Sequence, residues 1–260
     1  MKNKKPPTAL ITGAARGIGR GIAQRLLAAG WNVALADVLV NEGRATAAAL
    51  NRSKKKNFGR AEFILCDVAA EAQVAAAVTQ TTKLFGRLDA LVNNAGIANP
   101  YNVPVEKLSL EAWNHKLAVN LTGPFLCAKH AAPHLRRAPG GGAIVNISST
   151  RAFLAEPHTE TYNASKAGLL GLTRALALSL GPQVRVNAIC PGWIDTRPAK
   201  VSATAAKKEK HAQHPVGRVG RPEDIAELTL FLMEGPRSGF ITGQTIVCDG
   251  GMRVKLIYEE

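Results

Sequence analysis

"TALITGAARGIG", residues 8 to 19, joins a short apolar run to a glycine-rich turn that leads into a helical pattern. Three glycines allow the backbone to turn tightly and to approach a pyrophosphate, and free N–H groups at the helix start face that anion. The turn contains Gly13, Arg16, Gly17, Ile18 and Gly19. Alone it is a weak signal, because the glycines could serve only the packing of the helix on the strand.

Asp37 supplies the context that such a turn needs. It ends the second apolar run, so that a strand precedes the turn, a helix follows it and an acidic residue closes the next strand. This combination favours dinucleotide binding. A carboxylate there accepts hydrogen bonds from the adenosine ribose and repels the extra phosphate of NADP, so NAD is the expected cofactor. Arg16 leaves NADP open, since it could pair with that phosphate or simply be a solvated cation.

Short apolar runs alternate with longer helical patterns along the chain. The runs cover residues 8–12, 32–37, 61–67, 88–94, 143–149, 184–190 and 244–249. The helical patterns cover residues 17–30, 41–52, 70–86, 106–137, 160–180 and 222–234. Strands that are continuously apolar are buried on both faces, which predicts an α/β, doubly wound parallel sheet flanked by helices on both faces. Right-handed crossovers then place the carboxyl ends of all the strands along one edge, and ligands bind at this edge where the strand order switches.

A single domain is expected over residues 1–260, because no repeat, low-complexity segment or long linker divides the chain. The polar stretch 192–221 interrupts the alternation. A long insertion beside the ligand edge is typical of a lid or specificity loop.

Bulk composition bounds the class of protein. The chain has 260 residues and is 46% hydrophobic, without an apolar run of membrane-spanning length or a signal-type segment. The protein is therefore expected to be soluble and cytoplasmic. The four cysteines are widely spaced and are interpreted as reduced thiols: Cys66, Cys127, Cys190 and Cys248.

The formal charge of +14 raises the question of a polyanionic partner. The excess lysine and arginine is scattered over termini and loops, and aromatic residues, at 5%, are not interleaved with it. A solvated basic surface is favoured over a nucleic-acid site, which remains an alternative. No nucleic-acid or membrane partner is expected.

"TETYNASKAGLLGL", residues 159 to 172, carries Tyr162 and Lys166 on an otherwise packing helix. Positions i and i+4 share a helix face, so both side chains project together. A nearby ammonium stabilises phenolate and is expected to lower the tyrosine pKa below its usual value of about 10. A tyrosine tuned in this way can exchange a proton with an alcohol.

Six motifs occur in one order: "TGAARGIG" (12–19), "NNAG" (93–96), "IVNISS" (144–149), "YNASK" (162–166), "PGWIDT" (191–196) and "DGG" (249–251). On these motifs the chain resembles the classical short-chain dehydrogenase/reductase family over nearly its whole length. The resemblance implies a Rossmann-type fold with a seven-stranded parallel sheet, commonly assembled as a homotetramer. It also implies an enzyme that interconverts a secondary alcohol and a ketone or aldehyde with a nicotinamide cofactor.

The resemblance assigns four catalytic residues. Tyr162 would be the general acid or base, Lys166 would also bond the nicotinamide ribose, Ser149 would bond the substrate oxygen, and Asn120 would hold a water in a proton path. It further implies cofactor contacts at the remaining motif positions: Asp67, Val68, Asn93, Asn94, Ala95, Gly96, Pro191, Gly192, Ile194 and Thr196. Asp249 is assigned a structural role.

The substrate is expected to be a small polar molecule, such as a polyol, sugar or hydroxy acid, because polar side chains crowd the segments beside the site. The substrate candidates are Ser149, Arg151, Glu156, His158 and Trp193, and the surrounding segments add Glu160, Arg197, His211 and His214. Many of these side chains could instead be merely solvated. The two lid histidines lack further ligands nearby, so no metal is expected.

Two other functions stay open. A 3-oxoacyl carrier-protein reductase would share these motifs, and a basic surface would suit an acidic carrier, although Asp37 disfavours the NADPH that such enzymes typically use. A non-catalytic dinucleotide sensor is the alternative of another class. Such proteins commonly lose the Tyr-x-x-x-Lys pair, which this chain keeps.

Overall fold

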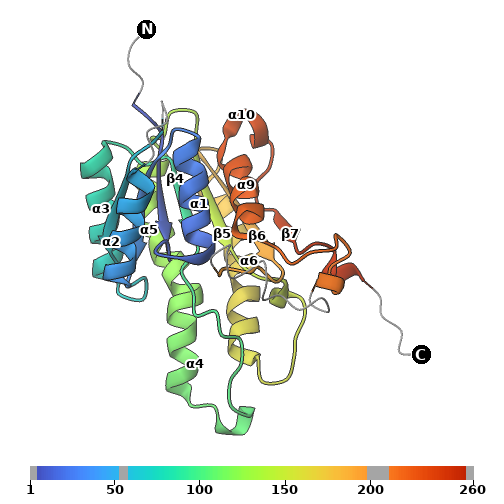
Figure 1. Ribbon diagram of the computed structural model, residues 1–260. Coiled ribbons are helices and arrows are strands. Elements are labelled where there is room, and N and C mark those ends of the chain that lie inside the picture. The colour runs from blue at the N-terminus through green and yellow to red at the C-terminus, as the bar shows by residue number, and fades with distance from the viewer. Residues whose placement is uncertain (1–4, 53–57, 198–210, 256–260) are drawn as a thin grey trace.

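The computed structural model describes residues 5–52, 58–197 and 211–255, and its centre is one parallel sheet (Figure 1). Seven strands lie in the order β3-β2-β1-β4-β5-β6-β7 and all neighbouring pairs are parallel. Their bounds are Thr8–Thr12 (β1), Asn32–Asp37 (β2), Ala61–Leu65 (β3), Ala90–Asn93 (β4), Gly142–Ile147 (β5), Val184–Pro191 (β6) and Thr245–Cys248 (β7). The predicted seven-stranded parallel fold is confirmed. Strand order reverses between β1 and β4, and the carboxyl ends of these strands are where a doubly wound sheet binds its ligand.

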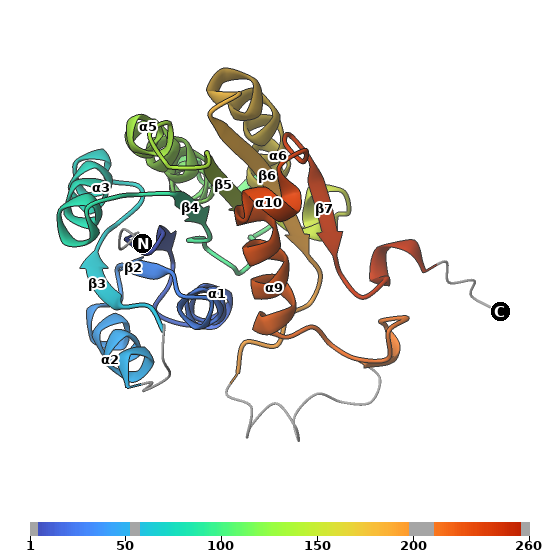
Figure 2. The same cartoon turned by 90° about the horizontal axis from the view of Figure 1, so that it is seen from above.

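Helices cover both faces of the sheet (Figure 2). One face carries α1 (Gly17–Ala28), α2 (Val40–Asn51) and α9 (Pro222–Met233), and the other carries α3 (Glu71–Phe85), α5 (Gly123–Leu135) and α6 (Glu160–Leu180). The short α10 (Gly235–Ser238) follows α9. One large buried cluster therefore lies on each side of the sheet, as the continuously apolar strands require.

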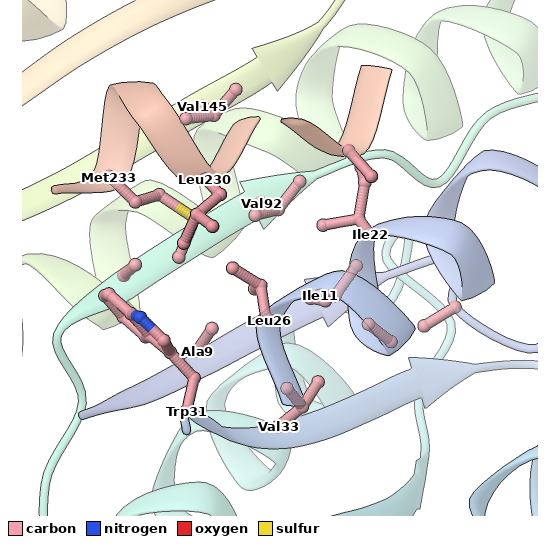
Figure 3. Close-up of a cluster of buried hydrophobic side chains, with 14 of the residues drawn as sticks. Ala9, Ile11, Ile22, Leu26, Trp31, Val33, Val92, Val145, Leu230 and Met233 are labelled. Carbon is pink, nitrogen blue, oxygen red and sulfur yellow. The ribbon is translucent and has the colours of Figure 1, made fainter. Parts of the chain in front are cut away.

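The core beneath α1 and α9 fixes the glycine turn in place (Figure 3). Leu26 of α1 and Leu230 of α9 are about 1% exposed or less, and they pack with the fully buried strand residues Ile11 and Val92. Full burial of such a side chain contributes about 1.5 to 3 kcal/mol. The start of α1 is thus anchored on a rigid layer.

The predicted helix over residues 106–137 is wrong in its start and its regularity. A 3-10 turn, Val105–Lys107, precedes α4 (Leu110–Leu117), and the Ser109 hydroxyl caps α4 by accepting from Ala112 N at 3.1 Å. A π turn over Ala118–Thr122 then joins α4 to α5. Gly123 N bonds Ala118 O, five residues back, and the next residue, Pro124, has no N–H to continue the regular ladder. Such π turns are frequent at functional sites.

The two ends of the insertion after β6 pair with each other. Ile194 pairs with Gly220 in an isolated parallel bridge, and Asp195 N donates to Gly220 O at 2.9 Å. Residues 198–210 of the predicted lid lie outside the described residues. Within the described ranges, no helix combines the length and the apolar character needed to cross a membrane. The expected single domain over 1–260 stays a prediction.

Candidate active site

A cavity of about 940 Å³ opens at the carboxyl ends of the central strands. Its wall includes all the expected cofactor residues except Gly19 and Asn93: Gly13, Arg16, Gly17, Ile18, Asp37, Asp67, Val68, Asn94, Ala95, Gly96, Tyr162, Lys166, Pro191, Gly192, Ile194 and Thr196. Gly19 is buried behind the turn, and Asn93 is 2% exposed with its amide bonded to Asn146 Oδ1 at 2.8 Å. Motifs that are distant in the sequence therefore meet on one concave surface.

The glycine turn is a close-fitting backbone cradle. Gly13 has φ +64°, and a Cβ there would lie 2.7 Å from Ala95 Cα. A Cβ at Gly19 would overlap the Gly13 carbonyl oxygen. Asn94 ties the neighbouring turn to this one, because its Nδ2 donates to Gly13 O at 2.8 Å and to Thr12 O at 3.0 Å. No side chain larger than hydrogen fits at Gly13 or Gly19 without displacing backbone.

Asp37 is held on the cavity wall by two backbone donors. Ala15 N donates to its Oδ2 at 2.9 Å and Leu39 N donates to its Oδ1 at 3.0 Å. The residue is 8% exposed, whereas Arg16 is exposed. Each carboxylate oxygen keeps a lone pair that could accept from a ribose hydroxyl.

The start of α1 faces the same cavity, and no side chain caps its first turn. Orphan N–H groups at a helix start attract anions such as a diphosphate. Further along the wall, Asp67 Oδ1 accepts from Ala69 N at 2.9 Å, and Val68 is 5% exposed. The glycine turn, the uncapped start of α1 and the Asp37 carboxylate together fit a dinucleotide.

Tyr162 and Lys166 face each other on the cavity wall, as the helix spacing predicts. Lys166 Nζ lies 5.7 Å from the centre of the Tyr162 ring and donates to Ile147 O at 2.9 Å. Ser149, two residues after β5, lines the same cavity as Tyr162. The adjacent Ser148 donates to Lys166 O at 2.8 Å, which ties α6 to that strand. Three predicted catalytic side chains thus meet.

Burial dominates the ionisation of this pair, contrary to the expected depression of the tyrosine pKa. Desolvation raises the pKa of Tyr162, and the opposing effects of the nearby Ser149 hydroxyl and the Arg151 charge are smaller. Desolvation also lowers the pKa of Lys166 to about 8. The low-polarity surroundings disfavour both charged forms, so proximity to an ammonium does not by itself produce a phenolate.

Asn120 lies in the π turn and is 1% exposed. Its Oδ1 accepts from Ile97 N at 2.8 Å, and its Nδ2 donates to Ile97 O and to Ser165 Oγ, each at 3.3 Å. A Cβ on Gly96 would lie 3.3 Å from Asn120 Oδ1 and 3.7 Å from Lys166 Nζ. Asn120 therefore sits beside Lys166 but is not part of the cavity wall.

The substrate candidates separate into two groups. Ser149 and Trp193 line the cavity, whereas Arg151, Glu156 and His158 do not. Arg151 Nη2 donates to Glu156 Oε1 at 2.6 Å, so these two side chains satisfy each other. His158 adopts φ +64°, and its carbonyl accepts from Asn102 N at 2.6 Å.

The other polar candidates also have structural partners. Arg197 pairs with Asp195 at 2.6 Å, and Glu160 accepts from Asn102 Nδ2 at 3.3 Å. His211 Nδ1 accepts from Val219 N at 3.2 Å, and His214 is 2% exposed. Asp249, expected to be structural, accepts from the backbone of Gly251 and Arg253 at 2.8 Å each.

Several wall residues were not predicted. They are Val38, Leu39, Cys66, Ile97, Ala98, Asn99, His115, Val119, Ile147 and Ser148. Ile97 to Asn99 directly follow the "NNAG" motif, and His115 and Val119 are four positions apart on the helix before Asn120. Adjacency to the motifs and helical spacing could have identified these residues.

Comparison with known proteins agrees with this geometry. A family model described as enoyl-(acyl carrier protein) reductase matches residues 13–253. An uncharacterized oxidoreductase of Thermotoga maritima is 42% identical over 257 residues, covering 97% of this chain and 98% of that one. A cis-4-hydroxycyclohexanecarboxylate dehydrogenase of Sinomonas cyclohexanicum is 40% identical over 249 residues, covering 94% and 95%.

A solved short-chain type dehydrogenase/reductase from Mycobacterium ulcerans superposes with a TM-score of 0.86 at 32% identity, covering 96% of this chain and 90% of that one. Sequence, fold and site thus agree over almost the entire length. The chain belongs to the classical short-chain dehydrogenase/reductase family and is an oxidoreductase of the type that acts on CH–OH groups.

Proposed function

We propose that the protein is an NAD(H)-dependent dehydrogenase that interconverts a small polar secondary alcohol and the corresponding carbonyl compound. The observation that carries this proposal is the meeting of Ser149, Tyr162 and Lys166 on the wall of the cavity that also contains the glycine turn and Asp37. A proton-transfer group and a dinucleotide cradle then share one cavity. That combination suits an exchange of a hydride and a proton with an alcohol.

When bound, the nicotinamide supplies the hydride chemistry at the carbinol or carbonyl carbon. Tyr162 then takes the alcohol proton in oxidation or gives its proton to the carbonyl oxygen in reduction. Ser149, on the same cavity wall, bonds the substrate oxygen and orients it beside the Tyr162 hydroxyl. Lys166 donates one N–H to Ile147 O, which leaves two N–H groups for ribose hydroxyls.

The raised pKa of Tyr162 keeps the phenol protonated at neutral pH. That state can donate a proton in reduction, while oxidation needs phenolate. Oxidation is therefore expected to accelerate with rising pH over the alkaline range, more than reduction does.

NAD is favoured over NADP because Asp37 stands fixed on the wall by two backbone N–H groups. A carboxylate that is anchored in this way resists swinging aside to admit a phosphate. Arg16, exposed in the same turn, is the feature that favours NADP instead.

Among polyols, sugars and hydroxy acids, the hydroxy acid has the strongest support. The Sinomonas relative is named for a hydroxycarboxylate substrate, which agrees with this assignment.

A carrier-protein reductase is the second candidate, favoured by the description of the matching family model and by the formal charge of +14. The anchored Asp37 argues against its usual NADPH. Reduction of ketones that is insensitive to salt and unchanged by an acidic carrier would exclude this candidate.

The direct test is a panel of polyols, sugars, linear hydroxy acids and alicyclic hydroxy acids with NAD, followed by absorbance of the reduced cofactor. Turnover with a hydroxy acid is expected, faster with NAD than with NADP. Binding of NADH without turnover of any member would instead favour a dinucleotide sensor. A cytoplasmic homotetramer is part of the proposal, and light scattering of the purified protein tests the assembly.

A further inference from the structure

Lys116 is a buried lysine that the proposed chemistry does not use. It lies near the end of α4 and is 8% exposed, and its Nζ donates to Asn102 Oδ1 at 2.8 Å and to Asn99 O at 3.3 Å. Lysine is almost never buried in this way unless partners compensate the charge. Both partners lie in the loop that follows β4, so the ammonium binds that loop to the helix.

The same loop is bound a second time by Asn120. Asn120 bonds both the N–H and the carbonyl of Ile97, and it lies four positions after Lys116 in the chain. The two side chains hold the loop at points on either side of Ala98. Ile97, Ala98 and Asn99 all line the cavity, so this stretch of its wall depends on both contacts.

Asn102 extends the connection to the helix that carries Tyr162. Its Nδ2 donates to Glu160 Oε2 at 3.3 Å, and its backbone N–H donates to His158 O at 2.6 Å. Glu160 opens α6, two residues before Tyr162. Figure 1 shows α4 and the start of α6 extending together beyond the sheet edge, and the two helices pack on each other.

We propose that Lys116 is a positioning residue for the substrate side of the site, holding the loop after β4 between α4 and α6 through Asn99 and Asn102. Without the ammonium, two loop oxygens lose their donor and the chain Lys116–Asn102–Glu160 is broken. The wall at Ile97 to Asn99 then shifts relative to Tyr162. This inference rests on the proposed function, because the wall matters only if an alcohol reacts at Tyr162.

The test compares Lys116→Met with Lys107→Met. Methionine keeps most of the length of the side chain but has no donor. Lys107 is an exposed lysine in the turn before α4, so its change removes the same charge from the surface. For Lys116→Met, kcat/KM for the alcohol is expected to fall about tenfold, mostly through KM, because misplacement of substrate contacts is costly. The Kd for NADH should stay within about twofold, since the glycine turn is not contacted. Lys107→Met should match the wild type.

Two further measurements separate positioning from a general loss of structure. Amide hydrogen exchange over residues 97–102 should be faster in Lys116→Met and unchanged over the glycine turn. Asn102→Ala should show the same kinetic defect, and the double variant should be no worse than either single one, because both act through one contact. If Lys116→Met does not fold, Asn102→Ala at its half-buried position carries the test alone.

Unchanged hydrogen exchange, or faster exchange with KM at the wild-type value, would overturn the role of Lys116. Additive losses in the double variant would do the same. A wild-type protein without turnover on any alcohol would refute the proposed function instead, and hydrogen exchange would still decide whether Lys116 holds the loop.

Discussion

The cofactor side and the substrate side of the cavity are built in different ways. On the cofactor side, backbone groups define the shape: Gly13 touches the Ala95 backbone, and Asp37 accepts from two main-chain N–H groups. On the substrate side, side chains bond one another. Behind that part of the wall, Arg151 meets Glu156, whose side chain is 51% exposed, and Lys116 reaches across to Asn102; none of the four lines the cavity itself.

This difference has a physical consequence for how each half tolerates change. A backbone cradle cannot adjust to an added methyl group without moving the chain. Exposed ion pairs contribute little to stability and can exchange partners at small cost. The cofactor half should therefore respond sharply to small substitutions, while the substrate half should respond mainly where a group is buried.

Lys166→Met should have the largest effect and should act on activity and stability in opposite directions. Turnover is expected to fall by about 10² to 10⁴ because the donors to the nicotinamide ribose and the charge beside Tyr162 are both lost. At pH 7 the free energy of unfolding should rise by about 2 kcal/mol. Removing the buried ammonium, whose pKa is depressed from 10.5 to about 8, stabilises the folded state, and the lost bond to Ile147 O offsets part of this gain. Urea unfolding measures this.

The pH dependence of that stability follows from the direction of the shift. Between the folded pKa near 8 and the unfolded pKa of 10.5, the unfolded chain binds more protons, so this group makes the wild type more stable as pH rises. The advantage of Lys166→Met should therefore shrink across this window. Lys83→Met, at an exposed helical position, is the matched control. A constant difference from pH 7 to 10 would contradict the burial of a charged amine.

Gly13→Ala should strongly weaken cofactor binding. The new Cβ would lie 2.7 Å from Ala95 Cα, in a backbone with φ +64°. The Kd for NADH is expected to rise by more than about tenfold and stability to fall by roughly 2 to 4 kcal/mol. Gly140→Ala is the matched control, since Gly140 has φ +91° with open space around it. Gly140→Ala should lower the free energy of unfolding by about 1 kcal/mol and bind NADH normally. Equal losses of stability and NADH affinity in the two variants would contradict the close fit of the backbone at Gly13.

Asp37→Asn should weaken the choice between cofactors without destroying binding. Asparagine keeps one oxygen acceptor but removes the charge that repels a phosphate, so the preference for NADH over NADPH should fall about tenfold, or about 1.4 kcal/mol. Fluorescence titration with both cofactors measures the ratio. Asp67→Asn, also on the wall, is the control for charge alone. A ratio that stays at the wild-type value in Asp37→Asn would show that Asp37 does not select between the two cofactors.

Glu156→Gln should have the smallest effect. The carboxylate is half exposed, and glutamine can still accept from Tyr101 Oη, which donates to Glu156 Oε2 at 2.6 Å. Stability should change by less than about 1 kcal/mol and kcat/KM by less than about threefold. A larger kinetic loss would place the pair of Arg151 and Glu156 in substrate binding.

The two halves also differ in how far the sequence predicts them. Glycines and Asp37 are constrained by backbone geometry that depends on local chain order, so their place on the wall follows from strand, turn and helix. Arg151, Glu156 and His158 are polar residues near the site in sequence, but which of them reaches the cavity depends on side-chain pairing across two loops. No spacing rule encodes that pairing.

The helix before the site shows the same limit within one element. Apolar periodicity predicts a helix around Asn120, but not the π turn that Pro124 and Gly123 produce there. Helical spacing likewise predicts that Tyr162 and Lys166 meet. It does not predict the pKa directions, because these depend on how deeply the surrounding layers bury both groups.

The proton-transfer role of Tyr162 is tested most directly by Tyr162→Phe in a paired measurement of alcohol turnover and NADH affinity. Phenylalanine keeps the ring against Lys166 and removes only the hydroxyl. The expected result is a fall in kcat of about 10² to 10⁴ with the Kd for NADH within about twofold of the wild type. Turnover near the wild-type rate would show that another group moves the proton and would contradict the role of Tyr162 as the general acid and base.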